Sequence, residues 1–386
     1  MREVYLDNSA TTRVLPEVAA AMQDVLLEQY GNPSSLHRKG VAAERKKTEA
    51  RRIIAGACGV KDSEIYFTSG GTEANNLAVK GAARRYRRRG THLITTKAEH
   101  PSVLHTFRAL EAEGFTVTYL DVDRDGVVSA ADVLGALRED TILVSVMHVN
   151  NEVGAVMPVE EIGRRIRREK QDVLFHVDTV QSFGKLAVNP ALWQADLLTI
   201  SAHKIHGPKG AGALYRREGV HLEPIMHGGD QETGLRPGTE NMAGIAGFGE
   251  AARQAMAGRD RHFRRMTDLK QRLLAGLRER IPDIVQNGPA DGAPHILNVT
   301  VPDIKGEVLV HTLEEWGIYI STGSACHSHR ADPSHVLLAM GLQEKEIAAS
   351  LRFSFSPLNT EEEIDYTVEK MQEAVESLRL ITRRGL

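Results

Sequence analysis

Residues 197–210 read LLTISAHKIHGPKG, an apolar run followed directly by a lysine that stands between two histidines. The run at 197–200 has the composition of a strand that is covered on both faces. Lys204 follows it, with His203 before it and His206 after it. A solvated surface lysine needs no such setting, whereas a partly desolvated lysine that reacts as an amine does. The stretch therefore predicts a reactive group at the end of a buried strand.

Working outward, six further segments of strand composition lie between about residue 60 and 215, and helical patterns separate several of them. The segments are 64–68, 92–95, 116–120, 142–147, 173–177 and 212–215. Residues 74–88 and 159–170 have the periodicity of helices. This alternation predicts an α/β fold with a doubly wound, mostly parallel sheet of seven strands.

The alternation of strand and helix patterns ends after Asn241. The elements expected there are a long helix toward Arg280 with Phe263 among its apolar positions, strands at 296–301 and 317–320, a helix at 305–316, and a last helix with Thr360 and Glu363 as its capping box. We therefore predict a large domain at 16–255, and a smaller α+β domain at 256–386 that the N-terminal residues 1–15 join.

Composition excludes several classes of protein. The chain has 386 residues and a net charge of −3, which favours neither nucleic acid nor an anionic membrane as a partner. The arginines at 84–89 close a predicted helix, where cations are favourable. No apolar signal core opens the chain, and no stretch has the roughly 18 apolar residues that a membrane span needs. With only two cysteines, no disulfide framework is expected, and we predict a cytoplasmic protein.

Residues 121–132 resemble a calcium-binding loop, with aspartates at its first, third and fifth positions. Asp132 stands where a bidentate glutamate is usual, and a strand pattern precedes the loop in place of a helix. The segment therefore predicts an Asp/Gly turn.

Polar residues follow the predicted strands where these end. In doubly wound sheets, ligands bind outside the carboxyl ends of the strands. The residues that follow the strands are Gly71 and Thr72 in a Ser-Gly-Gly-Thr turn, Glu99 and His100, Asn150, Asn151 and Glu152, Asp178 and Gln181, and Ser201, His203 and Lys204. Each has a structural alternative: the turn is also suited to capping a helix, and Asp178 to the same task.

Together these residues comprise an anion cup, an imidazole, a carboxylate, an amide and a lysine. Pyridoxal 5′-phosphate (PLP) requires such a set of groups, because its aldehyde forms a Schiff base with a lysine and its ring nitrogen pairs with a carboxylate. Lys209 has similar spacing but lies further from the strand end, so Lys204 is the predicted Schiff-base lysine.

Motifs along essentially the whole chain resemble the cysteine desulfurases of the NifS/IscS type. They are YLDNSATT at 5–12, GNPSS at 31–35, FTSGGTE at 67–73, HVNNE at 148–152, HVD at 176–178, HK at 203–204 and RPGTEN at 236–241. The resemblance implies a homodimer with the class-V aminotransferase fold, which is PLP-dependent transferase fold type I.

The resemblance also implies roles for single residues. His100 would stack on the PLP ring, Asp178 would face its nitrogen, and Gln181 would bond its hydroxyl. The phosphate would be held by Gly71, Thr72, Ser201 and His203, and by Thr239 of the other subunit. Asn151 and Arg352 would bind the substrate carboxylate, for which a guanidinium is suited because it binds bidentately.

A second reactive group is predicted in the Gly/Ser-rich loop at 321–333, which carries Cys326. Two histidines and Arg330 near Cys326 favour its thiolate. Cys58 lies among small apolar residues and is expected to be buried. The string Cys-His-Ser-His at 326–329, with His335 nearby, also suits a metal, but a solvated loop is favoured and we expect no metal site.

The reaction implied is conversion of L-cysteine to L-alanine, with Lys204 moving the α-proton, His100 exchanging a proton with the thiol, and Cys326 receiving the sulfur as a persulfide. The sulfur would pass to an acceptor, such as an iron–sulfur scaffold protein. The alternatives are a selenocysteine lyase, an aminotransferase of the same fold, and a non-catalytic scaffold. Cys326 disfavours the aminotransferase, and the complete set of reactive residues disfavours the scaffold.

Overall fold

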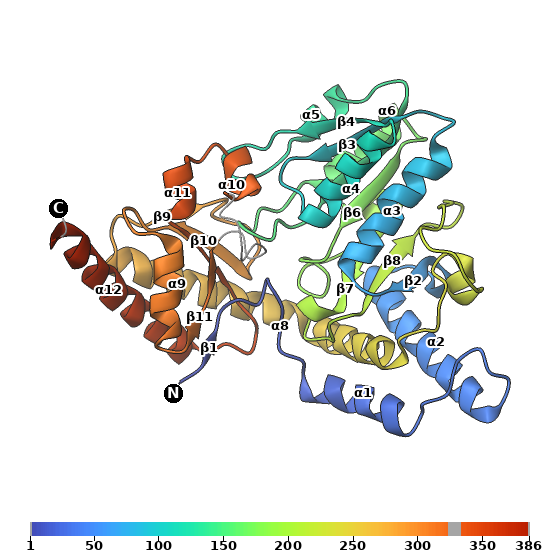
Figure 1. Ribbon diagram of the computed structural model, residues 1–386, viewed down its shortest axis with the longest axis horizontal. Helices are drawn as coiled ribbons and strands as arrows, with labels where there is room; N and C mark the ends of the chain where they lie inside the picture. Colours follow the sequence, from blue (N-terminus) through green and yellow to red (C-terminus); the bar gives the residue numbers. More distant parts are fainter. Residues whose placement is uncertain (1, 323–332, 385–386) are drawn as a thin grey trace.

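A seven-stranded sheet forms the larger part of the protein (Figure 1). The computed structural model describes residues 2–322 and 333–384. The strands, in their order across the sheet, are β2 (Ile65–Thr68), β8 (Gly212–Arg216), β7 (Leu197–Ser201), β6 (Leu174–Asp178), β5 (Thr141–Met147), β3 (His92–Thr96) and β4 (Thr116–Leu120). All neighbours pair in parallel except β8, which is antiparallel to β7 and β2. The predicted sheet, its strand count and its mostly parallel character are confirmed.

Helices cover both faces of this sheet, because its strands are apolar on both sides. They are α1 (Pro16–Leu27), α2 (Arg38–Cys58), α3 (Gly71–Tyr86), α4 (Pro101–Ala112), α5 (Ala130–Gly135), α6 (Val159–Glu169) and α7 (Pro190–Trp193), with short 3₁₀ turns η1 (Asp62–Glu64), η2 (Ala202–Lys204) and η3 (Gln231–Gly234). Leu77 and Phe107 belong to the core beneath α3 and α4. Ile54 and Ile162 belong to the core on the other face.

A four-stranded antiparallel sheet forms the smaller part, and both chain termini lie beside it (Figure 1). Its order is β12 (Ser321–Thr322), β13 (Ser350–Ser354), β10 (Ile296–Thr300) and β9 (Val285–Asn287), and the other elements here are α9 (Gly306–Glu314), α10 (His335–Ala339), α11 (Glu344–Ala348) and α12 (Glu361–Arg384). The first strand, β1 (Val4–Tyr5), pairs in parallel with β11 (Ile318–Tyr319). The predicted capping box of α12 is present: Glu363 N–H donates to Thr360 Oγ1 at 3.2 Å, and Thr360 N–H donates to Glu363 Oε2 at 3.1 Å.

One continuous helix, α8 (Met242–Arg280), joins the two parts. Phe248 near its start belongs to the core of the large sheet, and Leu273 near its end belongs to the core of the small sheet. The boundary at 255/256 falls between these two contacts and stays a prediction. Phe263, expected in the apolar stripe, is 40% exposed, because α8 crosses from one core to the other at that point.

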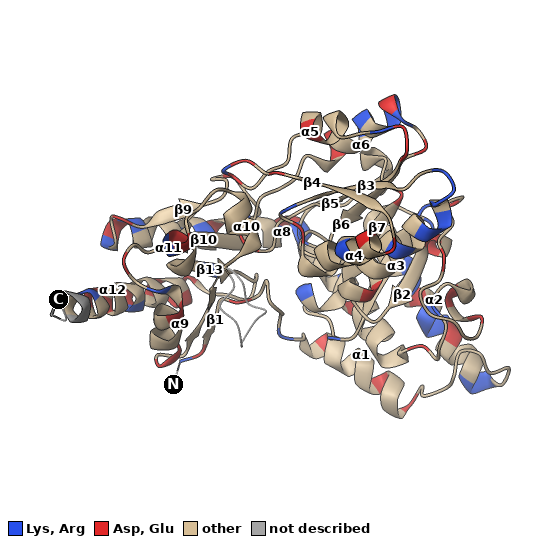
Figure 2. Cartoon of the chain, turned by 45° about the horizontal axis from the view of Figure 1, so that its top comes forward, with Lys and Arg blue, Asp and Glu red and all other residues tan. Residues whose placement is uncertain are grey.

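The aspartate-rich segment at 121–132 forms a turn, as predicted. Asp123 Oδ1 accepts the N–H groups of Asp125 and Val127, each at 2.9 Å, and the strand β4 precedes the turn. Acidic and basic side chains are intermixed over the helices (Figure 2), in keeping with the small net charge. Within the described ranges, no helix has both the length and the apolar character needed to cross a membrane.

Candidate active site

The parallel strands bring the predicted polar residues to one edge of the large sheet. Lys204 ends the η2 turn directly after β7, and its ammonium donates to the carbonyl of Ser9 and, at 2.6 Å, to that of Ala10. Gln181, in the segment after β6, donates from Nε2 to the same Ser9 carbonyl at 3.1 Å. Lys204 and Gln181 therefore lie together beneath the N-terminal segment.

The two histidines around Lys204 bind that N-terminal segment. His203 Nδ1 lies 3.2 Å from Thr11 Oγ1, and His206 Nδ1 lies 2.8 Å from the carbonyl of Arg13. Burial, and secondarily the charge of Lys204, lowers the pKa of His203 to about 3, so this ring is neutral. The histidines thus hold residues 9–13 over Lys204 without adding charge.

Asp178 ends β6 and is buried at 5% exposure. Its Oδ2 accepts a hydrogen bond from Asn75 Nδ2 at 2.8 Å, and its Oδ1 accepts the N–H of Val180 at 2.9 Å. Burial raises the pKa of Asp178, while these hydrogen bonds and Lys204 act in the opposite direction. A carboxylate held by two donors has a fixed orientation, which a partner for a ring nitrogen requires.

His100 is joined to Asp178 through two residues that the sequence did not single out. His100 Nδ1 lies 2.8 Å from Ser102 Oγ, and Asn75 Nδ2 donates to that oxygen at 2.9 Å as well as to Asp178. His100 also caps α4, because its Nδ1 accepts the N–H of Ser102. Burial, followed by the charge of Lys204, lowers the pKa of His100 to about 4.

The predicted anion cup forms where α3 begins. A Cβ at Gly71 would lie 2.9 Å from Val180 Cγ2, so a glycine allows the helix start to approach the loop after β6. Ser201 lies near the same position, with its Cβ 3.7 Å from a Cβ built at Gly71, and Thr72 lines a cavity of about 390 Å³ together with His100. The structure does not bring Thr239 into this group: it is exposed and makes no hydrogen bond to another described residue.

Arg352 lies in the middle of β13 and faces the large sheet. Its Nη1 donates to the carbonyl of Asn151 at 3.0 Å, and its Nη2 donates to Asp7 Oδ1 at 2.8 Å. The residue is 2% exposed. The predicted pair of Asn151 and Arg352 is therefore in contact across the junction of the two sheets.

Several buried polar atoms in this region have no hydrogen-bond partner among the described residues, and four of them belong to residues predicted to hold the cofactor or the substrate. They are Ser201 Oγ, Gln181 Oε1, Asn151 Oδ1 and Arg352 Nε. Buried polar groups in proteins are nearly always paired. Their gathering around Lys204 and Asp178 fits a site that binds a polar ligand.

Cys326 and its loop neighbours at 323–332 lie outside the described residues, as do His327 and His329. The flanking residues are tied to the site. Ser321 pairs with Arg352 in the small sheet, and His335 Nε2 lies 2.8 Å from the carbonyl of Glu99. The side chain of Ser334 donates to Glu152, whose pKa burial raises to about 7.

The other cysteine, Cys58, is buried at the end of α2, as expected. It is 2% exposed, and burial raises the pKa of its thiol to about 12. Such a thiol is unreactive near neutral pH.

A lysine, a buried carboxylate and an anion cup at the strand ends of a doubly wound sheet define a PLP-dependent fold type I protein. The chain belongs to the aminotransferase class-V family, whose model matches residues 4–367. This family is PLP-dependent.

Individual relatives carry more specific names than the family. The chain is 44% identical over 382 residues to a protein of Dictyoglomus turgidum named cysteine desulfurase IscS, with 99% of this chain and 96% of the relative covered. It is 46% identical over 379 residues to a protein of the same name from Methanosarcina thermophila, with 98% and 93% covered. A solved structure titled NifS-like protein superposes with a TM-score of 0.92 at 39% identity, over 97% of this chain and 100% of the other.

Proposed function

We propose that this protein is a PLP-dependent cysteine desulfurase that converts L-cysteine to L-alanine and takes the sulfur onto Cys326 as a persulfide. One observation carries the proposal: Lys204, whose charge acts on the buried Asp178, and Arg352 both bind the N-terminal segment, Lys204 at Ser9 and Ala10 and Arg352 at Asp7. The names of the relatives in Dictyoglomus and Methanosarcina support it.

The residues present fit PLP. Gly71, Thr72, Ser201 and His203 would hold its phosphate, Asp178 its ring nitrogen, Gln181 its hydroxyl, and Lys204 its aldehyde, with His100 against the ring. The unpaired Ser201 Oγ and Gln181 Oε1 are suited to this task. When bound, PLP supplies an aldehyde for the substrate amine and a ring that accepts electrons when substrate bonds break.

The side chains of the protein then bind and orient the substrate. Arg352 and Asn151 would bind the cysteine carboxylate. Arg352 would donate from its Nε, which has no described partner, and Asn151 would donate from its side-chain amide nitrogen. The Lys204 amine would take the α-proton and later return a proton to carbon. Asp178 would keep a proton at the pyridine nitrogen.

His100 would exchange a proton with the substrate thiol. Its lowered pKa keeps the ring neutral near pH 7. Because Nδ1 is hydrogen-bonded to Ser102, Nε2 is the atom that would exchange the proton. The Cys326 thiolate would attack the substrate sulfur. The C–S bond breaks, an S–S bond forms, and the carbon keeps the electron pair and takes a proton to become the methyl group of alanine.

We further propose a homodimer in the cytoplasm. The exposed Thr239 lies in the segment after η3, and Arg236 of that segment pairs with Glu73 of α3 at 2.8 Å. The segment therefore lies beside the helix that begins at the anion cup, and from there Thr239 would reach the phosphate site of a second copy. The sulfur acceptor would be a protein, such as an iron–sulfur scaffold.

A single-turnover reaction of the holoenzyme with L-cysteine tests the proposal. Alanine release and the mass of the peptide that carries Cys326 are followed together with the visible PLP band. We expect one alanine and one added sulfur per active site, both lost in Cys326→Ser. Cys58→Ser is the matched control, because its thiol is buried, and it should retain both products.

A different outcome would redirect the assignment. A coloured protein that releases no alanine from cysteine, but releases it from selenocysteine, is a selenocysteine lyase. Formation of a keto acid with retention of sulfur would identify an aminotransferase. A protein that takes up no PLP would be a non-catalytic scaffold.

A further inference from the structure

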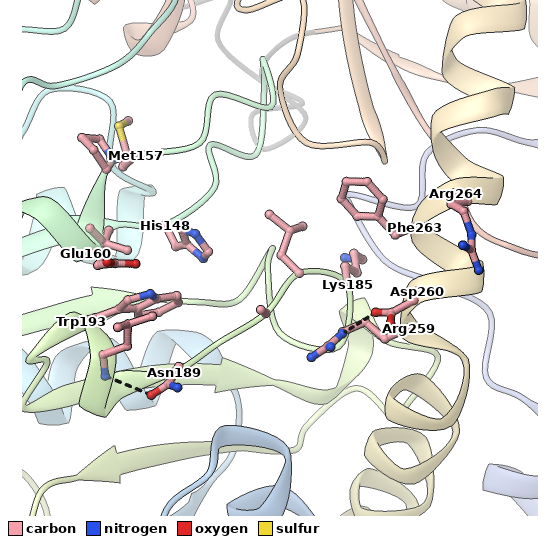
Figure 3. A pocket seen from close by; sticks show the side chains of 15 residues that line it. His148, Met157, Glu160, Lys185, Asn189, Trp193, Arg259, Asp260, Phe263 and Arg264 are labelled. Atoms are coloured by element: carbon pink, nitrogen blue, oxygen red, sulfur yellow. Dashed lines mark hydrogen bonds and ion pairs between the residues drawn. The ribbon is translucent and has the colours of Figure 1, made fainter.

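A cavity separate from the proposed PLP site lies between the segment after β6 and the middle of α8 (Figure 3). Its volume is about 610 Å³, within the range of roughly 300–1,000 Å³ that is typical of small-molecule sites. None of the residues proposed to hold PLP or the substrate lines it. His148 and Trp193 lie on one side of the cavity, Phe263 and Lys185 lie near each other on the other side, and Arg264 follows Phe263 on α8 (Figure 3).

Two basic side chains of this cavity, Lys185 and Arg264, have no counter-ion among the described residues. Its carboxylates are each engaged with an arginine: Asp260 with Arg259 at 3.1 Å, and Glu160 with Arg164 at 3.6 Å. Neither Lys185 nor Arg264 forms an ion pair with a described residue. Lys185 is 8% exposed, and its ammonium reaches only the carbonyl of Gln181, at 3.4 Å. Burial, and secondarily the charge of Lys204, lowers the pKa of Lys185 to about 7. An anion bound beside this buried amine would favour its charged form, so the position suits an anionic ligand.

Three side chains with rings, His148, Trp193 and Phe263, line the cavity. The imidazole of His148 lies edge-on to the indole of Trp193, with 4.5 Å between centroids and 63° between planes. Phe263 is exposed on the opposite wall, where α8 crosses between the two cores. His148 is 7% exposed, points toward the cavity in Figure 3, and its Nδ1 has no hydrogen-bond partner among the described residues. The side of the cavity that carries His148 and Trp193 therefore offers a flat apolar surface and a buried polar atom.

We propose that this cavity binds a small anion that carries a flat ring, either an aromatic carboxylate or a nucleoside monophosphate. The anionic group would pair with Lys185 and Arg264, and the ring would lie between Trp193 and Phe263. The ring of the ligand would cover the exposed Phe263, and its anionic group would compensate the charge of Lys185. Both parts of the ligand are therefore required.

The protein carries its own reporter for this ligand. It has two tryptophans, Trp193 in the cavity wall and Trp316, which lies under Lys370 in the small part. In holoenzyme with Trp316→Phe, the emission of Trp193 is measured during titration with AMP and with benzoate. Adenosine and inorganic phosphate are the matched ligands that lack the charge or the ring.

We expect a saturable change with AMP or with benzoate, and an affinity at least tenfold higher than for adenosine or phosphate. Whichever of the two ring-bearing anions binds more tightly identifies the anionic group as phosphate or carboxylate. Lys185→Met should weaken binding at least tenfold, whereas Lys345→Met, an exposed lysine of α11, should leave it unchanged.

Arg264→Gln supplies an independent variant, because Arg264 is exposed and its guanidinium makes no described contact. It should weaken the binding severalfold even if Lys185→Met fails to fold. Equal responses to all four ligands, or unchanged affinity in both Lys185→Met and Arg264→Gln, would overturn the proposal.

Discussion

The carboxylate of Asp7 lies 2.8 Å from the guanidinium of Arg352, in an ion pair whose side chains are 19% and 3% exposed. Asp7 follows β1 near the N-terminus, and Arg352 lies in β13 near the other end of the chain. Because Arg352 also donates to Asn151, two interactions fix its orientation before a substrate carboxylate arrives. The N-terminal segment therefore helps to build the substrate site.

Asp7→Asn should destabilise the protein, because it leaves a buried guanidinium without a counter-ion. We expect a loss of about 3 kcal/mol in the free energy of unfolding, measured by urea denaturation of the holoenzyme. Asp365→Asn is the control, since its pair with Arg272 is about half exposed and should cost less than about 1 kcal/mol. Equal losses in the two variants would show that the Asp7 pair is no stronger than a surface pair.

Arg352→Lys should weaken substrate binding, because a lysine cannot bind a carboxylate bidentately. Loss of a hydrogen bond to a charged group corresponds to roughly 1.5–3 kcal/mol, so KM for cysteine should rise about 10- to 100-fold. The visible PLP band should be retained, since Arg352 is not among the residues proposed to hold PLP. An unchanged KM would remove Arg352 from the substrate site, and Arg272→Lys provides the matched exposed control.

Asn75→Ala should impair catalysis through Asp178, which Asn75 orients. Removing a hydrogen bond to a carboxylate should lower kcat about tenfold or more. Because the Asn75 amide opposes the effect of burial on Asp178, its loss should raise the pKa of that carboxyl further. The pH at which the visible PLP band changes should therefore differ from wild type in a spectrophotometric titration. A lower kcat with an unaltered band titration would point to a packing role instead.

Glu99→Gln should change how stability depends on pH. Glu99 is fully buried, and burial raises its pKa from 4.5 to about 8. Because the folded-state pKa exceeds the unfolded one, the contribution of this carboxyl to stability is complete below about pH 4.5 and is lost as the pH rises through 8. The glutamine variant cannot ionise, so relative to wild type it should gain roughly 2–4 kcal/mol between pH 5 and pH 9.

Urea denaturation at the two pH values measures this difference. Glu169→Gln, an exposed carboxyl at the end of α6, should show no comparable gain. If Glu99→Gln and wild type lose stability in parallel between the two pH values, the raised pKa of Glu99 is wrong.

The seven strands of the large sheet were predictable because several are nearly continuous apolar runs, whereas β4, with the sequence TVTYL, has the alternation of a half-exposed strand. The short strands β9 and β12 were missed, since three and two residues carry no periodic signal. β13 was missed because only Leu351 and Phe353 are apolar in it, which is too short a pattern to identify a strand, and the polar position between them carries Arg352. The exposure of Phe263 could not be predicted, because periodicity identifies the face of a helix and not the place where it leaves a core.

The site was predicted where reactive side chains follow strands, as at Lys204 and Asp178. Asn75 and Asp7 were not found, because their partners Asp178 and Arg352 are distant in the sequence. Ser102 was not found, because a polar residue in a helix is ordinarily solvated. The TSGGTE motif at 68–73 ends two residues before Asn75, and this proximity is a signal that could have drawn attention to it.

The pairing of β1 with β11 sets an order of events during synthesis on the ribosome. Residues 4–5 leave the ribosome first, but their partner strand at 318–319 follows only after more than three hundred residues have been added. The large sheet can form in that interval, because all of its strands lie between these two segments. Ser9 and Ala10, which accept hydrogen bonds from Lys204, take their final place only after β1 is paired. A nascent chain should therefore acquire its lysine environment only after residues 318–319 have emerged from the ribosome.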